Sequence, residues 1–406
     1  MRFVTGIGVM AIGVIGALAC LAWPAASSAV EMRGVTSTEI RIGQTMPYSG
    51  PVSAFGALGK GEAGYFKMLN ARGGINGRKV DLISLDDGYA PPKTVEQTRR
   101  LVESDEVALI FSSIGTAHNT AIAKYLQANN IPQLFLASGA SKFADIAQFP
   151  QATVGVQAPF RYEARLYARY ALAKNPNATF AVISQNDDFG RDYLAGLKDV
   201  LGEKYQSIVT ASTYEVTDPT IDSQIVKLKA SGADVFVIAA TPKFAAQAIR
   251  KAFEVGWRPL TFLSNTAVWI STVMIPAGVE AGTGIISTAY VKDPDDPAWK
   301  DDAGVKAWRE FMSQYVPEAD QHDTNYVNAY NSAMALEAVL KACGDDLSTE
   351  NILKHAYAIH DLELPMLLPG IKINTSPTDH IPVDQMQLMR FNGQNWQRFG
   401  ELQTGN

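Results

Sequence analysis

Short apolar runs rich in β-branched residues alternate along the chain with segments whose apolar residues recur at helical spacing. The runs in the first half predict strands at 40–45, 80–85, 107–111 and 133–136. The segments between them predict helices that end near residues 72, 103 and 129. Regular alternation of strand and helix predicts a parallel sheet that helices cover on both faces.

The same alternation restarts near residue 160. It predicts helices at 160–173, 191–201, 221–230 and 243–255 and strands at 179–184, 208–214, 235–239 and 260–263. Two more helices, at 303–315 and 325–342, follow a loop rich in Pro and Asp, and a strand pair is expected around 386–391 and 396. The fold class is therefore α/β, with two doubly wound units in succession. A length of 406 residues, 47% of them hydrophobic, provides enough apolar material for two lobes.

The N-terminus carries the pattern of an export signal. Arg2 precedes an almost uninterrupted apolar run over 7–23, and small residues follow up to Ala29. We expect a signal peptide over residues 1–29, because the run is short for a membrane anchor and a small-x-small site ends at Ala29. A minor alternative is a lipoprotein acylated at Cys20. If Cys20 leaves with the signal, Cys343 is the only thiol, and a buried inert thiol is expected there.

Composition excludes several classes of function. A formal net charge of -6, with scattered Lys and Arg, argues against a nucleic-acid partner. The five histidines are dispersed, and no G-x-S-x-G or H-E-x-x-H motif occurs, so neither a metal, a cofactor nor a catalytic residue is expected. Gly59, Gly61 and Gly64 match the dinucleotide pattern but stand some dozen residues beyond the strand, so they are expected only to ease a loop into a helix. The pairs Asp86-Asp87 and Asp187-Asp188 are expected in turns and helix caps.

Two polar segments follow neighbouring strands at the point where each strand gives way to a helix. They are Ser112-Ser113-Ile114-Gly115-Thr116-Ala117-His118 and Ala137-Ser138-Gly139-Ala140-Ser141. Free amides at two such helix starts would hold a carboxylate without an arginine. Helix capping by Thr116 and Ser141 alone explains the same residues equally well.

At this point the residues resemble a known family. Five motifs occur in an order similar to that of the leucine/isoleucine/valine-type periplasmic substrate-binding proteins of ABC transporters. They are Ile42-Gly43-Gln44-Thr45 with Ser49-Gly50-Pro51, Gly73-Gly74-Ile75-Asn76-Gly77, Asp86-Asp87, Ile131-Pro132 before 137–141, and Asp187-Asp188-Phe189-Gly190. The resemblance implies a type I two-lobe fold in which the chain crosses between lobes three times. It implies lobe 1 at 30–157 and 289–374, lobe 2 at 158–288 and 375–406, a periplasmic monomer and an inner-membrane permease as partner.

The resemblance also assigns ligand contacts. Gly115 and Thr116, with Gly139 and Ser141, correspond to segments that hold a ligand carboxylate, and Phe55 and Phe189 fall at aromatic positions. The full set of expected ligand contacts is Phe55, Ser113, Gly115, Thr116, Ser138, Gly139, Ala140, Ser141, Phe189, Thr241, Asn265 and Tyr326.

The chain departs from the family at two positions. Asn265 stands where branched-chain amino-acid binders have an acidic residue for the ligand's ammonium group, and Thr241 stands near a family tyrosine. A neutral amide compensates a buried ammonium poorly. We therefore expect a small carboxylate ligand with an apolar or aromatic body and no amino group. Binding of a branched-chain amino acid, a sensory ligand-binding domain and an exported hydrolase are the alternatives.

Overall fold

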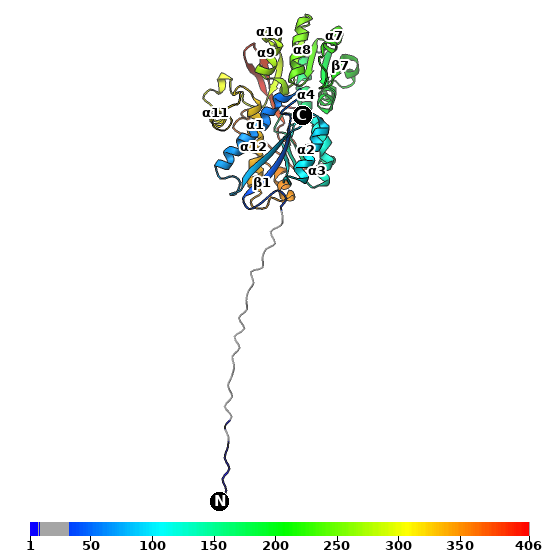
Figure 1. Cartoon of the computed structure of the whole chain (residues 1–406). Coiled ribbons are helices and arrows are strands. Elements are labelled where there is room, and N and C mark those ends of the chain that lie inside the picture. Colours follow the sequence, from blue (N-terminus) through cyan, green and yellow to red (C-terminus); the bar gives the residue numbers. More distant parts are fainter. Residues whose placement is uncertain (7, 9–31, 406) are drawn as a thin grey trace. The chain divides into compact units, whose positions relative to one another are not determined.

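Two β-sheets, one of five strands and one of seven, organise the part of the chain that the structure describes (Figure 1). This computed structural model describes residues 1–6, 8 and 32–405. Of the predicted signal peptide, residues 1–29, the structure therefore describes only residues 1–6 and 8, and Cys20 lies outside the described residues. Within the described residues, no helix is both long enough and apolar enough to span a bilayer.

The five-stranded sheet is parallel throughout, in the order β2-β1-β3-β4-β5. Its strands are β1 (Glu39–Met46), β2 (Lys79–Asp86), β3 (Ile110–Phe111), β4 (Gln133–Leu136) and β5 (Ala152–Val154). The helices between them are α1 (Gly56–Ala71), α2 (Pro91–Glu103) and α3 (Thr116–Ala128), with the 3-10 turns η1 (Ser53–Phe55) and η2 (Ser141–Ala144).

The seven-stranded sheet has the order β12-β11-β10-β9-β8-β6-β7 and is parallel except where β11 pairs with β10 and with β12. Its strands are β6 (Phe180–Gln185), β7 (Val209–Tyr214), β8 (Val235–Ala239), β9 (Leu260–Leu263), β10 (Ile286–Ala289), β11 (Gln385–Phe391) and β12 (Trp396–Thr404). The elements between them are α4 (Phe160–Lys174), α5 (Asp188–Leu201), η3 (Gly202–Lys204), α6 (Tyr205–Ile208), α7 (Asp222–Ala230), α8 (Pro242–Glu254), η4 (Asn265–Ala267), the π-helical turn η5 (Ile270–Met274), α9 (Ile275–Ala277) and α10 (Val279–Gly282).

Residues after β10 return to the first sheet. They form η6 (Pro297–Trp299), α11 (Ala303–Tyr315), α12 (Asn325–Ala342) and α13 (Thr349–Ala356). Helix α12 packs along α1, and the Tyr65 hydroxyl donates to the carboxylate of Glu337, 272 positions away. The chain thus passes between the two sheets after β5, after β10 and before β11. This arrangement confirms the predicted fold class, while the residue boundaries of the lobes stay a prediction.

The glycines of the dinucleotide-like pattern lie inside α1 and not at its start, so the expectation that they ease a loop into the helix is wrong. They allow close packing of the helix: a Cβ on Gly61 would lie 2.7 Å from the Cβ of Ala329, and one on Gly64 would lie 2.4 Å from Cγ2 of Val316. The role of these glycines is therefore to bring α12 and the end of α11 close to α1.

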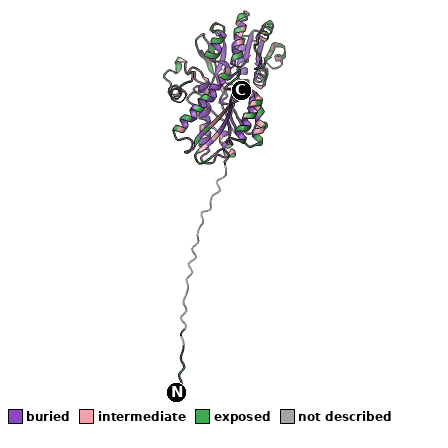
Figure 2. Cartoon of the chain, viewed as in Figure 1, coloured by how far each residue is buried: buried purple, intermediate pink, exposed green. Residues whose placement is uncertain are grey.

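The central strands are buried along their whole length. Every residue of β6 and of β8 is buried, as expected for a parallel sheet covered on both faces, and Figure 2 shows the strands in the colour of buried residues. The sequence patterns missed β5, β10 and α13, and they extended β3 backward over 107–109. Helix α5 begins three residues earlier than expected, because the Asp187 carboxylate accepts the N–H groups of Phe189 and Gly190 and caps it. Asp187 thereby takes the capping role that the sequence predicted.

Candidate ligand-binding site

A cavity of about 480 Å³ lies among the loops that follow the strands of both sheets. Thr116 follows β3, Thr241 follows β8 and Asn265 follows β9, and all three line it. Ligands of α/β proteins bind outside the carboxyl ends of parallel strands, and small-molecule pockets have volumes of about 300–1,000 Å³. Position and size are therefore those of a site for one small organic molecule.

One end of the cavity is rich in hydrogen-bond donors. Gly115, Thr116 and Ser138 line it there, and we call these three residues the α3 corner. The hydroxyls of Thr116 and Ser138 lie 2.8 Å apart. Gly115 is the N-cap of α3 and no side chain caps the helix, so the alternative in which Thr116 serves only as a cap is wrong. The first-turn amides of a helix have no partner within it and favour an anion.

Only glycine fits at the start of the α3 corner. Gly115 has φ +103°, a conformation that residues with a Cβ rarely adopt. A Cβ at this position would lie 2.3 Å from Nδ1 of His118 and 3.0 Å from Cε2 of Tyr89. Burial lowers the pKa of His118, so the ring beside the corner is held neutral.

Three non-glycine residues in the cavity wall have left-handed backbone: Tyr89 (φ 58°), Ser112 (φ 49°) and Phe135 (φ 49°). Such conformations cost free energy and gather at functional sites. Ser112 lies beside the buried carboxyl of Glu62, whose pKa burial raises to about 8. The wall beside β3 and β4 therefore combines strained backbone with a buried acid close behind it.

Aromatic rings from both halves of the chain cover the cavity. Phe55, at the end of η1, meets Trp269 edge-on with ring centroids 5.0 Å apart, and Phe189 meets Phe160 in the same way at 4.7 Å. All four rings line the cavity. Edge-to-face pairs of this kind add about 0.5–1.5 kcal/mol beyond the area that they bury.

Behind the wall of the second sheet lies the buried carboxyl group of Glu163. It accepts hydrogen bonds from the hydroxyl of Thr288 (2.6 Å) and the backbone N–H of Asn265 (3.0 Å), both of which line the cavity. The hydroxyls of Tyr167 and Tyr193 also donate to it. Burial raises the pKa of Glu163 to about 7, although these donors lower it. Glu163 therefore positions the wall of the cavity without reaching into it.

Charged side chains from other segments also line the cavity. Arg398 lies 3.3 Å from the carboxylate of Asp296, and His322 lies 2.7 Å from that of Asp295. Among the described residues that line the cavity, Arg398 is the only arginine or lysine. No lysine or arginine therefore reaches the α3 corner from this lining, and an anion there would depend on amides and hydroxyls.

Residues 39–395 match the model of the family described as periplasmic binding protein. The chain belongs to this family. The match runs from β1 to the turn before β12, and it confirms the resemblance to leucine/isoleucine/valine-type binding proteins. The family is one of substrate-binding and receptor proteins.

Several relatives and solved structures are similar to the chain over most of its length. "Leu/Ile/Val-binding protein homolog 7" of Brucella abortus is 23% identical over 340 residues, which cover 80% of this chain and 82% of that protein. A branched-chain amino acid ABC transporter protein of Thermus thermophilus with bound valine has a TM-score of 0.80 at 16% identity, covering 91% of this chain and 97% of that one. A fatty acid ABC transporter substrate-binding protein of Thermomonospora curvata has a TM-score of 0.75 at 18% identity, covering 92% and 94%.

The structure brings seven of the twelve expected ligand contacts to the cavity wall. They are Phe55, Gly115, Thr116, Ser138, Phe189, Thr241 and Asn265. Ser113, Gly139, Ala140, Ser141 and Tyr326 do not line the cavity. The Ser113 hydroxyl accepts the backbone N–H of Thr45, and the carbonyl of Gly139 accepts the N–H of Phe160. Ser141 donates to Asp192.

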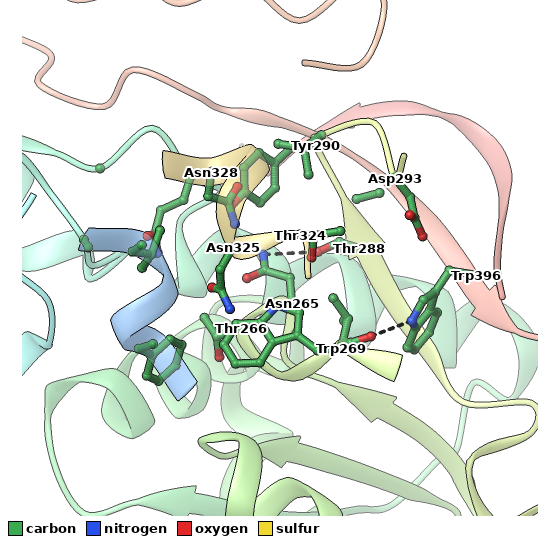
Figure 3. A pocket seen from close by; sticks show the side chains of 18 of the residues that line it. Asn265, Thr266, Trp269, Thr288, Tyr290, Asp293, Thr324, Asn325, Asn328 and Trp396 are labelled. Carbon is green, nitrogen blue, oxygen red and sulfur yellow. Dashed lines mark hydrogen bonds between the residues drawn. The ribbon is translucent and has the colours of Figure 1, made fainter. Parts of the chain in front are cut away.

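Sequence reasoning missed much of the opposite wall, shown in Figure 3. Trp269, Tyr290 and Thr288 line it, together with Asn325 and Asn328 of α12. A signal was available for the last two, because Asn325, Asn328 and Ser332 follow one another at i, i+3 and i+7 on one helix face, and all three line the cavity. A polar stripe on an otherwise apolar helix is the pattern that could have revealed them.

Proposed function

We propose that this chain is an exported solute-binding protein that delivers a small carboxylate-bearing compound with an apolar or aromatic body to an ABC importer. The single observation that carries this proposal is the uncapped N-terminus of α3 at the cavity, with the hydroxyls of Thr116 and Ser138 beside it. The wall near this corner offers donors without a fixed cation, and aromatic rings lie around it. An acid group with an apolar body complements both.

Binding proceeds by closure of the two halves over the ligand. The acid docks first at the α3 corner, and the second half then brings Phe189, Thr241 and Asn265 over it by hinge bending. Closure excludes water and strengthens the polar contacts inside. A dissociation constant in the micromolar range needs about -8 kcal/mol, which a buried ring and a well-bonded carboxylate supply. No bond is made or broken, so the chain acts as a carrier and not as an enzyme.

The export signal predicted over residues 1–29 supports a mature chain that starts after Ala29 and acts in the periplasm as a monomer. Its partner is the permease that recognises the closed form. A sensory receptor in place of the permease would need the same site. One structural neighbour is described as the binding protein of a fatty acid transporter, which supports an apolar acid as ligand.

A branched-chain amino acid is the second candidate. It is favoured by the name of the Brucella relative and by the valine bound in the Thermus structure. Against it stands Asn265, an amide where amino-acid binders have an acidic side chain. The ammonium group would remain without a charged partner at this position.

Isothermal titration calorimetry with leucine and with 3-phenylpropanoate separates the two. We expect the acid to bind and leucine to bind at least tenfold more weakly. The variant Thr116→Val removes a hydroxyl of the α3 corner and should weaken binding of the acid. Thr120→Val is the matched control, since the Thr120 hydroxyl donates to the carbonyl of Thr116 and does not line the cavity. Tight binding of leucine without binding of the acid would show that the proposed ligand class is wrong.

A further inference from the structure

Three asparagine side chains form a second polar position in the cavity, apart from the α3 corner. Asn265 follows β9, and Asn325 and Asn328 lie on the first turn of α12. In Figure 3 their amide groups point toward one another across the cavity. We call these three residues the asparagine wall.

The orientation of each amide follows from its neighbours. The Nδ2 group of Asn325 donates to Oδ1 of Asp323 over 2.8 Å, and its backbone N–H donates to the same oxygen over 2.9 Å. The Oδ1 atom of Asn328 accepts the hydroxyl of Tyr290 over 3.1 Å. The amide of Asn325 therefore presents its oxygen to the cavity, and the amide of Asn328 presents its NH₂ group.

Asn265 is oriented in a similar way. Thr288 gives its hydroxyl proton to Glu163, so the Thr288 oxygen is left to accept Nδ2 of Asn265, at a distance of 3.5 Å. The carbonyl oxygen of Asn265 then remains for the cavity. The asparagine wall thus offers two acceptors, on Asn265 and Asn325, and one donor, on Asn328.

These three groups have no partner within the described residues. Asn325 is the decisive one, because only 1% of its surface is exposed and yet its carbonyl oxygen meets no donor from the described part of the chain. A buried polar group left without a partner is costly, so an amide that lines a ligand cavity in this state points to a partner on the ligand.

The donors and acceptors of the asparagine wall define the charge of that partner. A second anionic group on the ligand would face two carbonyl oxygens, and an ammonium group would leave the NH₂ group of Asn328 without an acceptor. A methyl group would leave all three amides without partners. A neutral group that donates and accepts satisfies them, and the hydroxyl is the smallest such group.

We infer that the ligand is a hydroxylated monocarboxylic acid whose hydroxyl binds the asparagine wall. This inference rests on the proposed function and adds a second recognition element to it. A hydroxyl donates to the carbonyl of Asn325 or Asn265 and accepts from the NH₂ group of Asn328. Sites that hydrogen-bond a substrate hydroxyl discriminate strongly against analogues without it, because their own polar groups are left unpaired.

A series of matched acids tests this inference on the unaltered chain. The probes are 3-phenylpropanoate and its ring-substituted hydroxyl and methyl analogues, at the 3 and the 4 position, in isothermal titration calorimetry. We expect at least one hydroxyl isomer to bind about tenfold more tightly than the methyl isomer of the same position. Methyl or unsubstituted acids that bind as tightly as both hydroxyl isomers would overturn the inference and leave the proposed function intact. If none of the acids binds, the proposed function itself is wrong and the inference falls with it.

The variant Asn325→Leu links the preference to the asparagine wall. It should reduce the advantage of the hydroxyl isomer over the methyl isomer to less than threefold. Asn328→Leu, at a half-buried position, serves as the second variant if Asn325→Leu does not fold. Asn177→Leu, an exposed position away from the cavity, is the control and should preserve the preference. A hydroxyl preference that survives in the folded wall variants would also overturn the inference.

Discussion

The backbone N–H and the hydroxyl of Ser141 both donate to the carboxylate of Asp192, each over 2.6 Å. Ser141 begins η2, after β4 of the five-stranded sheet, whereas Asp192 lies on α5, beside the seven-stranded sheet. One residue further on, Nζ of Lys142 lies 2.6 Å from the carboxylate of Asp188. Donors expected from the resemblance to hold a ligand therefore hold the two halves of the chain together.

Replacing this carboxylate should favour the open form. We expect Asp192→Ala to weaken ligand binding by about threefold to tenfold, because the donors of Ser141 lose their partner in the closed form. Small-angle scattering of the ligand-bound variant should give a larger radius of gyration than that of the original chain. Asp199→Ala is the control, since Asp199 lies on the same helix but pairs with Arg161 and Arg165 of α4. Equal affinity and equal scattering for the two variants would contradict this role.

The left-handed glycine of the α3 corner predicts a second effect. Gly115→Ala places a methyl group 2.3 Å from Nδ1 of His118, so the first turn of α3 has to move. We expect affinity for the acid to fall by more than tenfold, measured by calorimetry. Gly73→Ala is the matched control, because Gly73 has φ +102° and nothing within 4 Å of the added methyl group. It should lower stability and preserve affinity. If both variants bind equally well, the corner does not hold the ligand.

The buried acid Glu62 predicts how stability changes with pH. Its pKa in the folded chain, about 8, is above the ordinary value of 4.5, so the folded state holds its proton more tightly than the unfolded state. Glu62 therefore lowers the free energy of unfolding progressively as pH rises from about 4.5 to about 8. The decrease is roughly 1.4 kcal/mol for each unit by which the two pKa values differ. Burial lowers the pKa of His118 and of His380, which act in the opposite direction.

The variant Glu62→Gln isolates this contribution. The glutamine side chain keeps an oxygen that can accept Nε2 of Gln44 but carries no titrating proton. We expect the Tm of the variant to exceed that of the original chain by several degrees at pH 8 and to match it at pH 5, as measured by scanning calorimetry. A constant difference in Tm across this range would mean that Glu62 does not titrate there.

The edge-to-face pair of Phe55 and Trp269 predicts a loss of affinity when either ring is removed. Phe55→Ala should weaken binding of the acid by about tenfold, because the ring lines the cavity and packs on Trp269. Phe149→Ala is the control: Phe149 is 8% exposed against 7% for Phe55, pairs with Phe143 at 4.9 Å, and does not line the cavity. Both variants should lose stability. Only the first should lose affinity, and equal affinities would contradict a role in closure.

Much of the fold follows from local patterns. The strands predicted at 133–136, 235–239 and 260–263 have the bounds that the structure shows, because each is an apolar run between clear breaks. β10 was missed because two of its four residues are Ser287 and Thr288, which are buried yet polar. The hydroxyl of Thr288 faces the carboxyl of Glu163, a partner 125 positions away that no local pattern reveals.

The site likewise has a part that local sequence patterns predict and a part that they do not. The α3 corner could be predicted because Gly115 and Thr116 stand together at the start of one helix. The role of Ser141 could not, because its hydroxyl is taken by Asp192, 51 positions along the chain. The thiol of Cys343 is buried, and burial raises its pKa to about 12, as the sequence led us to expect of an inert cysteine.

The hydrogen bond between Tyr65 and Glu337 has a consequence for biosynthesis. The helix that covers α1 leaves the ribosome only after five of the seven strands of the second sheet have been made. Until then the face of α1 that carries Gly61 and Gly64 lacks the helix that it packs against. A nascent chain that ends before α12 therefore cannot complete the fold of its first half. Because folding of the first half is delayed, the polypeptide stays extended for longer and can be translocated in that state. The native structure can form only when synthesis is nearly over.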